Sequence, residues 1–393
     1  MSFDNLQQIL DQRKQRSLYR RREILQSPQS PKIIVAGKTL LNFSSNDYLG
    51  LANHPRVVES FKLAADEYGV GGGASHLVNG HSHHHHELEL ELAEFCNRSR
   101  ALLFCSGYMA NVGVINALLG KTDAVFQDKL NHASLLDGGL LSGAKFQRYL
   151  HNDVDSLEKK LVRSTANRKL VVTDAVFSMD GNIANLPALA DKALQHNAWL
   201  MIDDAHGIGV LGETGAGCSE LYKLSEQQVP VLMGTLGKAF GTSGAFVAGS
   251  DALIETLIQF SRTYIYTTSM PPAVAAASRT SLKLIQKESW RREHLQLLIS
   301  RFKSGCEQLG LVLLPSDTAI QPIMIGAEHT AVAISEKLSS LGVQVKAIRT
   351  PTVPLNQARL RVTFSAAHSL DDLQQLLAAL ATVVKEIKFE YPY

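Results

Sequence analysis

The sequence has little that would suit a secreted, membrane-bound or nucleic-acid-binding protein. Its 393 residues include four cysteines, Cys96, Cys105, Cys218 and Cys306, and their spacing suggests no disulfide framework. A net charge of +2 is too small to indicate a nucleic acid or an anionic membrane as a partner. No apolar run approaches the roughly 20 residues of a membrane-spanning helix, and the polar N-terminus lacks a signal-peptide core. We therefore expect a cytoplasmic protein.

With 45% hydrophobic and 19% charged residues, the chain has an ordinary globular composition and is long enough for two domains. It shows no internal repeat and no low-complexity linker. From about residue 44 onward, apolar runs typical of strands alternate with stretches typical of helices, which predicts an α/β fold with a mainly parallel central sheet. The expected strands of this sheet lie near residues 100–104, 124–126, 145–149, 169–173, 199–202, 231–233 and 245–248.

Other patterns flank this alternation. Residues 1 to about 25 predict a helix with a basic end, and short apolar runs on either side of Gly37 predict a hairpin. A long helical stretch at about 272–310 precedes a C-terminal part, with strands expected near 312–325, 343–348 and 358–364 and a last helix at about 370–387. We therefore divide the chain into an N-terminal arm (1–43), a large cofactor-binding domain (44–285) and a smaller α+β domain (286–393).

The most informative residue is Lys238, which lies in the glycine-rich turn Thr235–Ala245. Glycines beside the lysine let a flat cofactor approach its amine closely, and the neighbouring hydroxyl groups suit a phosphate. Asp203 ends the apolar run 198–202, which predicts a buried parallel strand whose C-terminal edge faces a ligand. A lysine that holds an aldehyde as a Schiff base and an aspartate that keeps a pyridine nitrogen protonated together indicate pyridoxal phosphate (PLP).

The segment Phe104–Asn111 predicts a strand, a tight turn and the start of a helix. The N–H groups of Gly107 and Tyr108 would then lie at a helix N-terminus, which binds phosphate well, and the hydroxyl of Thr235 could assist. An ordinary turn with Ser106 as the helix cap explains the same pattern.

Three further polar residues could contact the cofactor ring. His206 can hydrogen-bond the phenolic oxygen, Ser178 can approach the same edge of the ring, and His132 can stack on its face. A structural role in a loop explains His132 equally well, and a lone histidine at position 206 is more often structural.

Five of the six positions 81–86 are histidine. Histidines four residues apart on a helix can chelate a metal ion, but no set of more distant ligands is visible. We therefore expect no physiological metal ion and interpret the run as a solvated or partly packed helix start, on which nickel or zinc could bind adventitiously.

Arginines in the C-terminal part and the arm are candidates for anion binding. Arg359 and Arg361 alternate along an expected strand, and Arg361 could hold a carboxylate through a bidentate contact. The alternative is that these two arginines are surface charges, as arginines on strands usually are. Arg349 precedes a turn framed by prolines, and Arg20 lies in the arm.

Taken in order, these residues resemble the α-oxoamine synthases, PLP enzymes that join an amino acid to an acyl thioester with loss of carbon dioxide. The resemblance implies a fold-type I, aminotransferase-like architecture and a homodimer with active sites at its interface. Ala239 departs from the glycine of many members, and the histidine run replaces residues that are usually apolar or mixed. The motifs that carry the resemblance are Asn42–Leu51, Asn131–Ser134, Val176–Gly181, Asp203–Gly207, the Lys238 turn and Tyr266–Pro272.

The resemblance also implies a role for each matching residue. The catalytic residues would be Lys238, His132, Asp203 and His206, and Ser178 would contact the oxygen side of the ring together with His206. The phosphate would be held by Gly107, Tyr108 and Thr235, and Thr267 or Thr268 would reach it from the partner subunit. The amino-acid carboxylate would be bound by Asn46 and Arg361, and the acyl substrate would be contacted by Arg20, Arg349 and Thr352, beside His132.

Within the family, Ala347–Arg349 followed by Pro351–Pro354 is most similar to the biotin-pathway members. These are acyltransferases that use L-alanine and a pimeloyl thioester, and the sequence leaves open whether coenzyme A or acyl carrier protein carries the thioester. One alternative is a sibling such as glycine C-acetyltransferase, aminolevulinate synthase or a serine palmitoyltransferase-like enzyme. Another is a non-catalytic protein that uses the histidine run to handle metal.

Overall fold

The computed structural model describes residues 3–15, 18–20 and 22–387. The chain forms two compact units. Unit 1 comprises Met1–Ser45, Met179–Gly181 and His294–Tyr393, and unit 2 comprises Asn46–Ser178 and Asn182–Glu293. The division of the sequence at residues 43 and 285 stays a prediction.

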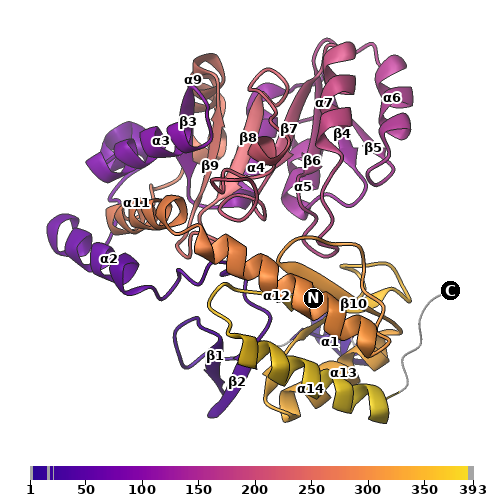
Figure 1. Cartoon of the computed structure of the whole chain (residues 1–393). Coiled ribbons are helices and arrows are strands. Elements are labelled where there is room, and N and C mark those ends of the chain that lie inside the picture. Colours follow the sequence, from indigo (N-terminus) through magenta and orange to yellow (C-terminus); the bar gives the residue numbers. More distant parts are fainter. Residues whose placement is uncertain (1–2, 16–17, 21, 388–393) are drawn as a thin grey trace. The chain divides into compact units, whose positions relative to one another are not determined.

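Unit 2 is built on a seven-stranded sheet with the order β3-β9-β8-β7-β6-β4-β5 (Figure 1). All seven strands lie where the sequence predicts them, and the sheet is mainly parallel as expected. The exception is β9, which is antiparallel to both of its neighbours, because only the short Lys238 turn separates it from β8. The strands are β3 (Arg100–Phe104), β4 (Ala124–Asp128), β5 (Lys145–Tyr149), β6 (Lys169–Asp174), β7 (Trp199–Asp203), β8 (Val231–Thr235) and β9 (Ala245–Gly249).

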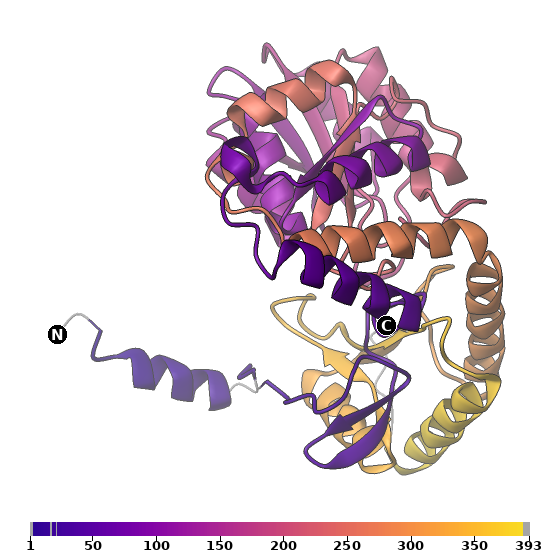
Figure 2. The ribbon, with the colours of Figure 1, turned by 90° about the vertical axis from the view of Figure 1, so that its left-hand side faces the viewer.

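Helices cover this sheet, as the view turned by 90° shows (Figure 2). Every residue of β4, β8 and β9 is buried, so these strands are covered on both faces. Helix α4 is apolar on most of its surface and packs into the core of unit 2, with Val114 and Ile115 fully buried. The helices of unit 2 are α2 (Pro55–Tyr68), the π-turn η1 (His76–Gly80), α3 (His83–Phe95), α4 (Gly107–Leu118), α5 (Ala133–Leu141), α6 (Val154–Val162), α7 (Leu186–Gln195), α8 (Cys218–Leu221), α9 (Asp251–Phe260), α10 (Arg262–Ile265) and α11 (Pro272–Lys287).

Unit 1 contains two small sheets. The order of the first is β1-β2-β11, in which β1 and β2 form the expected hairpin, and the order of the second is β10-β13-β12. Helix α12 (Trp290–Gln308) begins in unit 2 and ends in unit 1. The remaining elements are α1 (Leu6–Gln15), β1 (Lys32–Val35), β2 (Lys38–Asn42), β10 (Ile320–Gly326), α13 (Glu328–Ser340), β11 (Val343–Gln344), β12 (Lys346–Ile348), β13 (Ala358–Thr363) and α14 (Leu370–Glu386).

Four boundaries differ from the sequence prediction. The first helix covers only 6–15, and residues 18–20 and 22–25 are not helical. The helical stretch at 272–310 is two helices, because Glu288 leaves the helical conformation at φ −112° and ends α11. The expected strand at 343–348 is split between the two sheets, and the strand expected from 312 begins only at Ile320. Among the described residues, no helix combines the length and the apolar character needed to cross a membrane.

Candidate active site

Polar side chains end three neighbouring parallel strands of unit 2. Asp174 is the last residue of β6, Asp203 of β7 and Thr235 of β8. Asp174 and Asp203 are register partners, so the two carboxylates lie on adjacent strands at the same level. Because these strands run parallel, their carboxyl ends meet at one edge of the sheet, where ligands bind in α/β folds.

Lys238 belongs to a line of four polar side chains. Its amine lies 2.9 Å from Nε2 of His206, and Nδ1 of the same ring lies 2.5 Å from the Tyr48 hydroxyl. That hydroxyl in turn donates to Oδ1 of Asn46 at 3.3 Å. The structure therefore joins three residues that the sequence singled out, and it adds Tyr48, whose side chain the sequence did not identify.

The bonding pattern of this line fixes the direction of its hydrogen bonds. An ammonium group at Lys238 can only donate, so Nε2 of His206 accepts and Nδ1–H donates to the Tyr48 oxygen. The tyrosine hydrogen is then available for Asn46. A half-buried lysine that is held in this way presents its amine in one defined position.

A second network ties Asp203 to His132. Oδ2 of Asp203 accepts from Nδ2 of Asn111 at 2.7 Å, and Oδ1 accepts from the N–H of Ala205 at 3.0 Å. The same Asn111 nitrogen donates to the Ser134 hydroxyl at 2.9 Å, which lies 2.7 Å from Nδ1 of His132. Asn111 and Ser134 thus orient the carboxylate and the imidazole together, and the sequence did not identify either residue.

Asp174 is a second acidic residue at this edge of the sheet, and the sequence analysis did not identify it. Its Oδ2 accepts from the backbone N–H of His132 at 3.0 Å. Burial first, and then the neighbouring Asp203 carboxylate, raise the pKa of Asp174, whereas Lys238 and the His132 N–H oppose this effect. Asp174 consequently stays protonated at a pH at which an ordinary aspartate is ionised.

The expected phosphate-binding segment has the predicted local geometry. Gly107 and Tyr108 are the first two residues of α4, so their N–H groups have no acceptor within the helix. Ser106 caps the helix by accepting from the N–H of Met109 at 3.2 Å. The helix cap and the anion site are therefore compatible explanations of this turn.

The other residues expected around the phosphate and the ring are placed less tightly. The hydroxyl of Thr235 donates to the carbonyl of Gly244 at 3.0 Å and would have to turn to reach a phosphate. Thr267 and Ser178 are half-buried, and Thr268 is exposed.

Apart from Asn46 and His132, the residues expected to bind substrate lie in unit 1. Nη2 of Arg20 is 3.5 Å from the Thr352 hydroxyl, although the two residues are 332 positions apart. Arg349 donates to the carbonyl of Tyr19 at 3.3 Å, so the segment from 349 to 352 is bonded to the arm. Arg361 donates to the Thr363 hydroxyl at 3.0 Å.

The strand arginines are not surface charges. Arg359 is 3% exposed and Arg361 is 8% exposed, because β13 is the middle strand of its sheet. Asp180 forms an ion pair with Arg359, whereas Arg361 bonds the uncharged Thr363. The ion pair engages Arg359, and Arg361 stays the candidate that the sequence analysis named for a substrate carboxylate.

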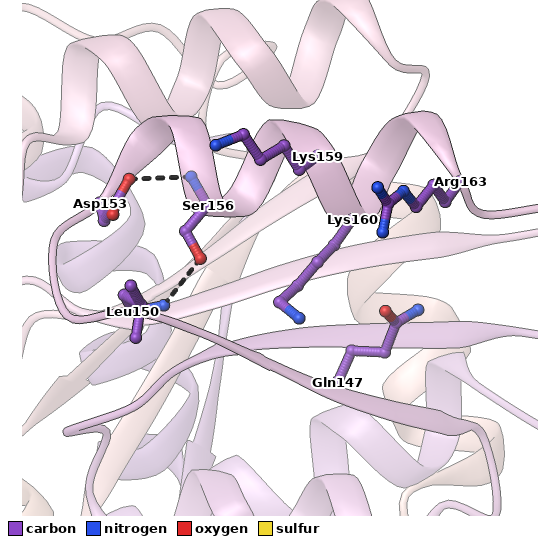
Figure 3. Close-up of a pocket in the computed structure, with 7 residues that line it drawn as sticks. All are labelled: Gln147, Leu150, Asp153, Ser156, Lys159, Lys160 and Arg163. Atoms are coloured by element: carbon purple, nitrogen blue, oxygen red, sulfur yellow. Dashed lines mark hydrogen bonds between the residues drawn. The ribbon is translucent and has the colours of Figure 1, made fainter.

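A separate cavity of about 330 Å³ lies between β5 and α6. Figure 3 shows its lining, in which Asp153 caps α6 at 2.8 Å from the N–H of Ser156. Lys159, Lys160 and Arg163 supply positive charge along its wall. Since β5 is the edge strand of the sheet and β4 separates it from β6, we do not assign this cavity to the site around Lys238.

The donor set around Lys238 fits PLP. It offers an amine for the aldehyde, a carboxylate at Asp203 for the pyridine nitrogen, an exposed imidazole at His132 for the ring face, and a helix N-terminus for the phosphate. The buried Oδ1 of Asn111 has no hydrogen-bond partner in the described part of the chain. This unpaired acceptor lies on the side chain that holds Asp203, as expected where a polar ligand belongs.

Known proteins of one family match this chain over nearly its whole length. A family model described as aminotransferase class I and II matches residues 38–380. The 8-amino-7-oxononanoate synthase of Saccharophagus degradans is 60% identical over 393 residues, which is 99% of each chain. A serine palmitoyltransferase variant from S. paucimobilis, solved with bound PLP–myriocin, is 30% identical with a TM-score of 0.92 over 98% of each chain. The 8-amino-7-oxononanoate synthase of Francisella tularensis is 32% identical with a TM-score of 0.77, over 88% of this chain and 98% of that chain.

Proposed function

The chain belongs to the 8-amino-7-oxononanoate synthases of the class I and II aminotransferase family, and we propose that it catalyses the reaction of these enzymes. It joins L-alanine to a pimeloyl thioester and releases 8-amino-7-oxononanoate, carbon dioxide and the free thiol carrier, as a step of biotin biosynthesis. Its cofactor is PLP. The observation that carries this proposal is the line from Lys238 through His206 to Tyr48, at the edge of the sheet where Asp203 lies.

We assign the cofactor-binding roles to residues of unit 2. Bound PLP supplies a ring that accepts electrons from the bonds broken at the alanine Cα. Asp203 pairs with the ring nitrogen, and the two N–H donors on its carboxylate keep it oriented for this contact. The remaining cofactor residues are Lys238, His132, His206, Ser178, Gly107, Tyr108 and Thr235, with Thr267 or Thr268 from a second copy of the chain.

Lys238 is the general base that removes the proton from the alanine Cα. His206 lies within hydrogen-bond distance of the lysine amine and holds it in position before and after this transfer. Tyr48 and Asn46 extend the line, so the charge that develops at Lys238 and His206 has polar partners within unit 2. The alanine Cα then bonds to the thioester carbonyl carbon, the thiol leaves, the carboxylate is lost, and Cα is protonated again.

The substrate-binding roles are assigned to Asn46 and His132 of unit 2 and to four residues of unit 1. Arg361 binds the alanine carboxylate together with Asn46, which its burial on the middle strand of its sheet supports. Arg20, Arg349 and Thr352 contact the acyl substrate, and their mutual bonding with the arm supports a shared role. Either coenzyme A or acyl carrier protein can carry this acyl group.

We further propose a homodimer with active sites at the interface. Its support is the exposed segment that contains Thr268 and Tyr266, whose side chain is 72% exposed. We also propose a cytoplasmic location, which the four free cysteines support.

The direct test is a turnover assay with pimeloyl thioester and either L-alanine, glycine or L-serine. Thiol release and product mass are followed for the wild type and for Lys238→Ala. We expect strong preference for L-alanine and no turnover in the variant. Preference for glycine would move the enzyme to a sibling reaction such as that of glycine C-acetyltransferase, and normal turnover of Lys238→Ala would refute the assignment of the base.

A further inference from the structure

A cluster of three histidines in unit 2 lies outside the residues assigned to catalysis. His81 and His85 belong to the histidine run, and His76 is the first residue of η1. Each side chain offers a ring nitrogen, and the three nitrogens lie within 4.8 Å of one another. The sequence interpretation lacked a ligand outside the run, and the π-turn of η1 supplies one in His76.

The nitrogens of His76 and His81 already face each other. Their Nδ1 atoms are 2.9 Å apart, so one of these rings donates a hydrogen to the other. The three nitrogen ligands of a tetrahedral zinc site, each about 2.0–2.1 Å from the metal, lie roughly 3.3 Å apart. A metal ion between these rings therefore requires the His76 and His81 nitrogens to move apart by a few tenths of an ångström and the third nitrogen to move in from a distance of at most 4.8 Å.

The surroundings of His85 leave Nδ1 as its metal ligand. Its Nε2–H donates to the carbonyl of Met270 at 2.8 Å, while Nδ1 accepts from the N–H of Ser82 at 3.0 Å. The Ser82 hydroxyl also lies 2.9 Å from this Nδ1, so metal binding there costs both contacts with Ser82 but keeps the bond to Met270. A backbone carbonyl that holds the second nitrogen of a ligating histidine is a common feature of metal sites.

A carboxylate is placed to support His81 in the same way. Oε2 of Glu89 lies 3.9 Å from Nε2 of His81, the nitrogen that points away from His76. The Tyr264 ring stacks on His76 with 5.0 Å between centroids and fixes the plane of that imidazole. The side chain of His81 is 30% exposed, which leaves an entry path and room for a water molecule as the fourth ligand.

We propose that His76, His81 and His85 form a binding site for a divalent transition-metal ion, zinc in the first place. Imidazole nitrogens suit zinc, copper and nickel, and three of them with one open position form a common zinc geometry. The site joins η1 to α3, and through Met270 it holds the segment that follows Thr268. Ala74, two residues before η1, is also bonded to that segment, because its carbonyl accepts from the N–H of Ser269 at 3.0 Å.

The test uses tag-free, PLP-loaded enzyme that has been freed of metal by a chelator and desalted. Zinc stoichiometry is measured by elemental analysis, affinity by competition with a chromophoric chelator, and ligand geometry by the visible absorbance of bound Co²⁺. His81→Gln is the main variant, because His81 is the most exposed of the three and its replacement leaves the core intact. His83→Gln is the matched control, since it makes the same change at an exposed position two residues away, at the start of α3.

We expect one zinc ion per chain, with a tetrahedral Co²⁺ spectrum. His81→Gln should weaken binding by more than the roughly 10- to 100-fold that loss of an outer-shell partner costs, and Glu89→Gln should fall within that range. His83→Gln should bind zinc as the wild type does. Equal losses in His81→Gln and His83→Gln, or no stoichiometric binding by the wild type, would show adventitious binding to exposed histidines and overturn the proposal.

Discussion

Asp204 is a fully buried carboxyl beside the proposed active site, and its replacement should make the protein more stable at neutral and alkaline pH. Its Oδ2 accepts from the N–H of Cys218 at 2.6 Å, while Oδ1 has no hydrogen-bond partner among the described residues. Burial is the main reason that the pKa of Asp204 rises from its ordinary value of 3.8 to about 7. In Asp204→Asn an oxygen remains for Cys218, and the charge is removed.

The sign of the effect follows from proton binding. Between its ordinary pKa of 3.8 and its folded-state pKa of about 7, Asp204 holds a proton in the folded protein that the unfolded chain has released. The free energy of unfolding therefore falls as pH rises through this window and levels off above it. A shift of about three units corresponds to about 4 kcal/mol, of which about 2–3 kcal/mol develops between pH 5 and pH 8.

The assay is denaturant unfolding of wild type and Asp204→Asn, measured at pH 5, 6, 7 and 8. The variant should gain about 2–3 kcal/mol relative to wild type across this range. Asp66→Asn is the matched control, since Asp66 is exposed on α2 and the same chemical change there should give a constant difference. A stability difference between wild type and Asp204→Asn that does not vary with pH would refute the reasoning.

Two further substitutions probe the active-site network and the lysine turn. Tyr48→Phe removes the hydroxyl 2.5 Å from His206 and should lower kcat about tenfold, the equivalent of one lost hydrogen bond. A pH profile of kcat that is unchanged in Tyr48→Phe would contradict the proposed line. Gly241→Ala should destabilise the protein by about 1–2 kcal/mol or more, because φ is +68° and the new Cβ would lie 2.3 Å from the N of Ala52. Gly71→Ala is its control, with no atom within 4 Å, and equal melting temperatures of the two variants would disprove the steric argument.

The sequence was sufficient to predict the sheet of unit 2 because its strands are buried and apolar. The apolar run Ala245–Gly249 did not itself show the direction of β9, since it has the same pattern in parallel and antiparallel pairs, and the short connection from β8 was the available signal. Burial of the strand arginines was also beyond the sequence, because alternation along β13 does not reveal that this strand is the middle one. Only the fold brings Asp180 to Arg359, 179 positions away.

The candidate site shows the same limit at the level of single residues. Lys238, Asp203, His206 and His132 were recognised because each lies in a local motif with its own chemistry. Tyr48 lies in the segment Asn42–Leu51 and Asn111 lies on α4. Local structure is enough to explain the presence of each residue, so neither one suggested a functional site. Their partners are distant in the sequence, since Tyr48 and His206 are 158 positions apart and Asn111 and Asp203 are 92 apart.

His76 shows that short separations can hide a contact as well. It lies five positions before His81, a spacing at which side chains of a regular α-helix point in different directions, so no helical pattern joins the two. The π-turn of η1, with Asn79 at φ −156°, changes the direction of the chain and turns the rings toward each other. A metal site built on such a turn cannot be recognised from periodicity, because Asn79 interrupts the helical geometry between His76 and His81, and the extended Ser82 interrupts it between His81 and His85.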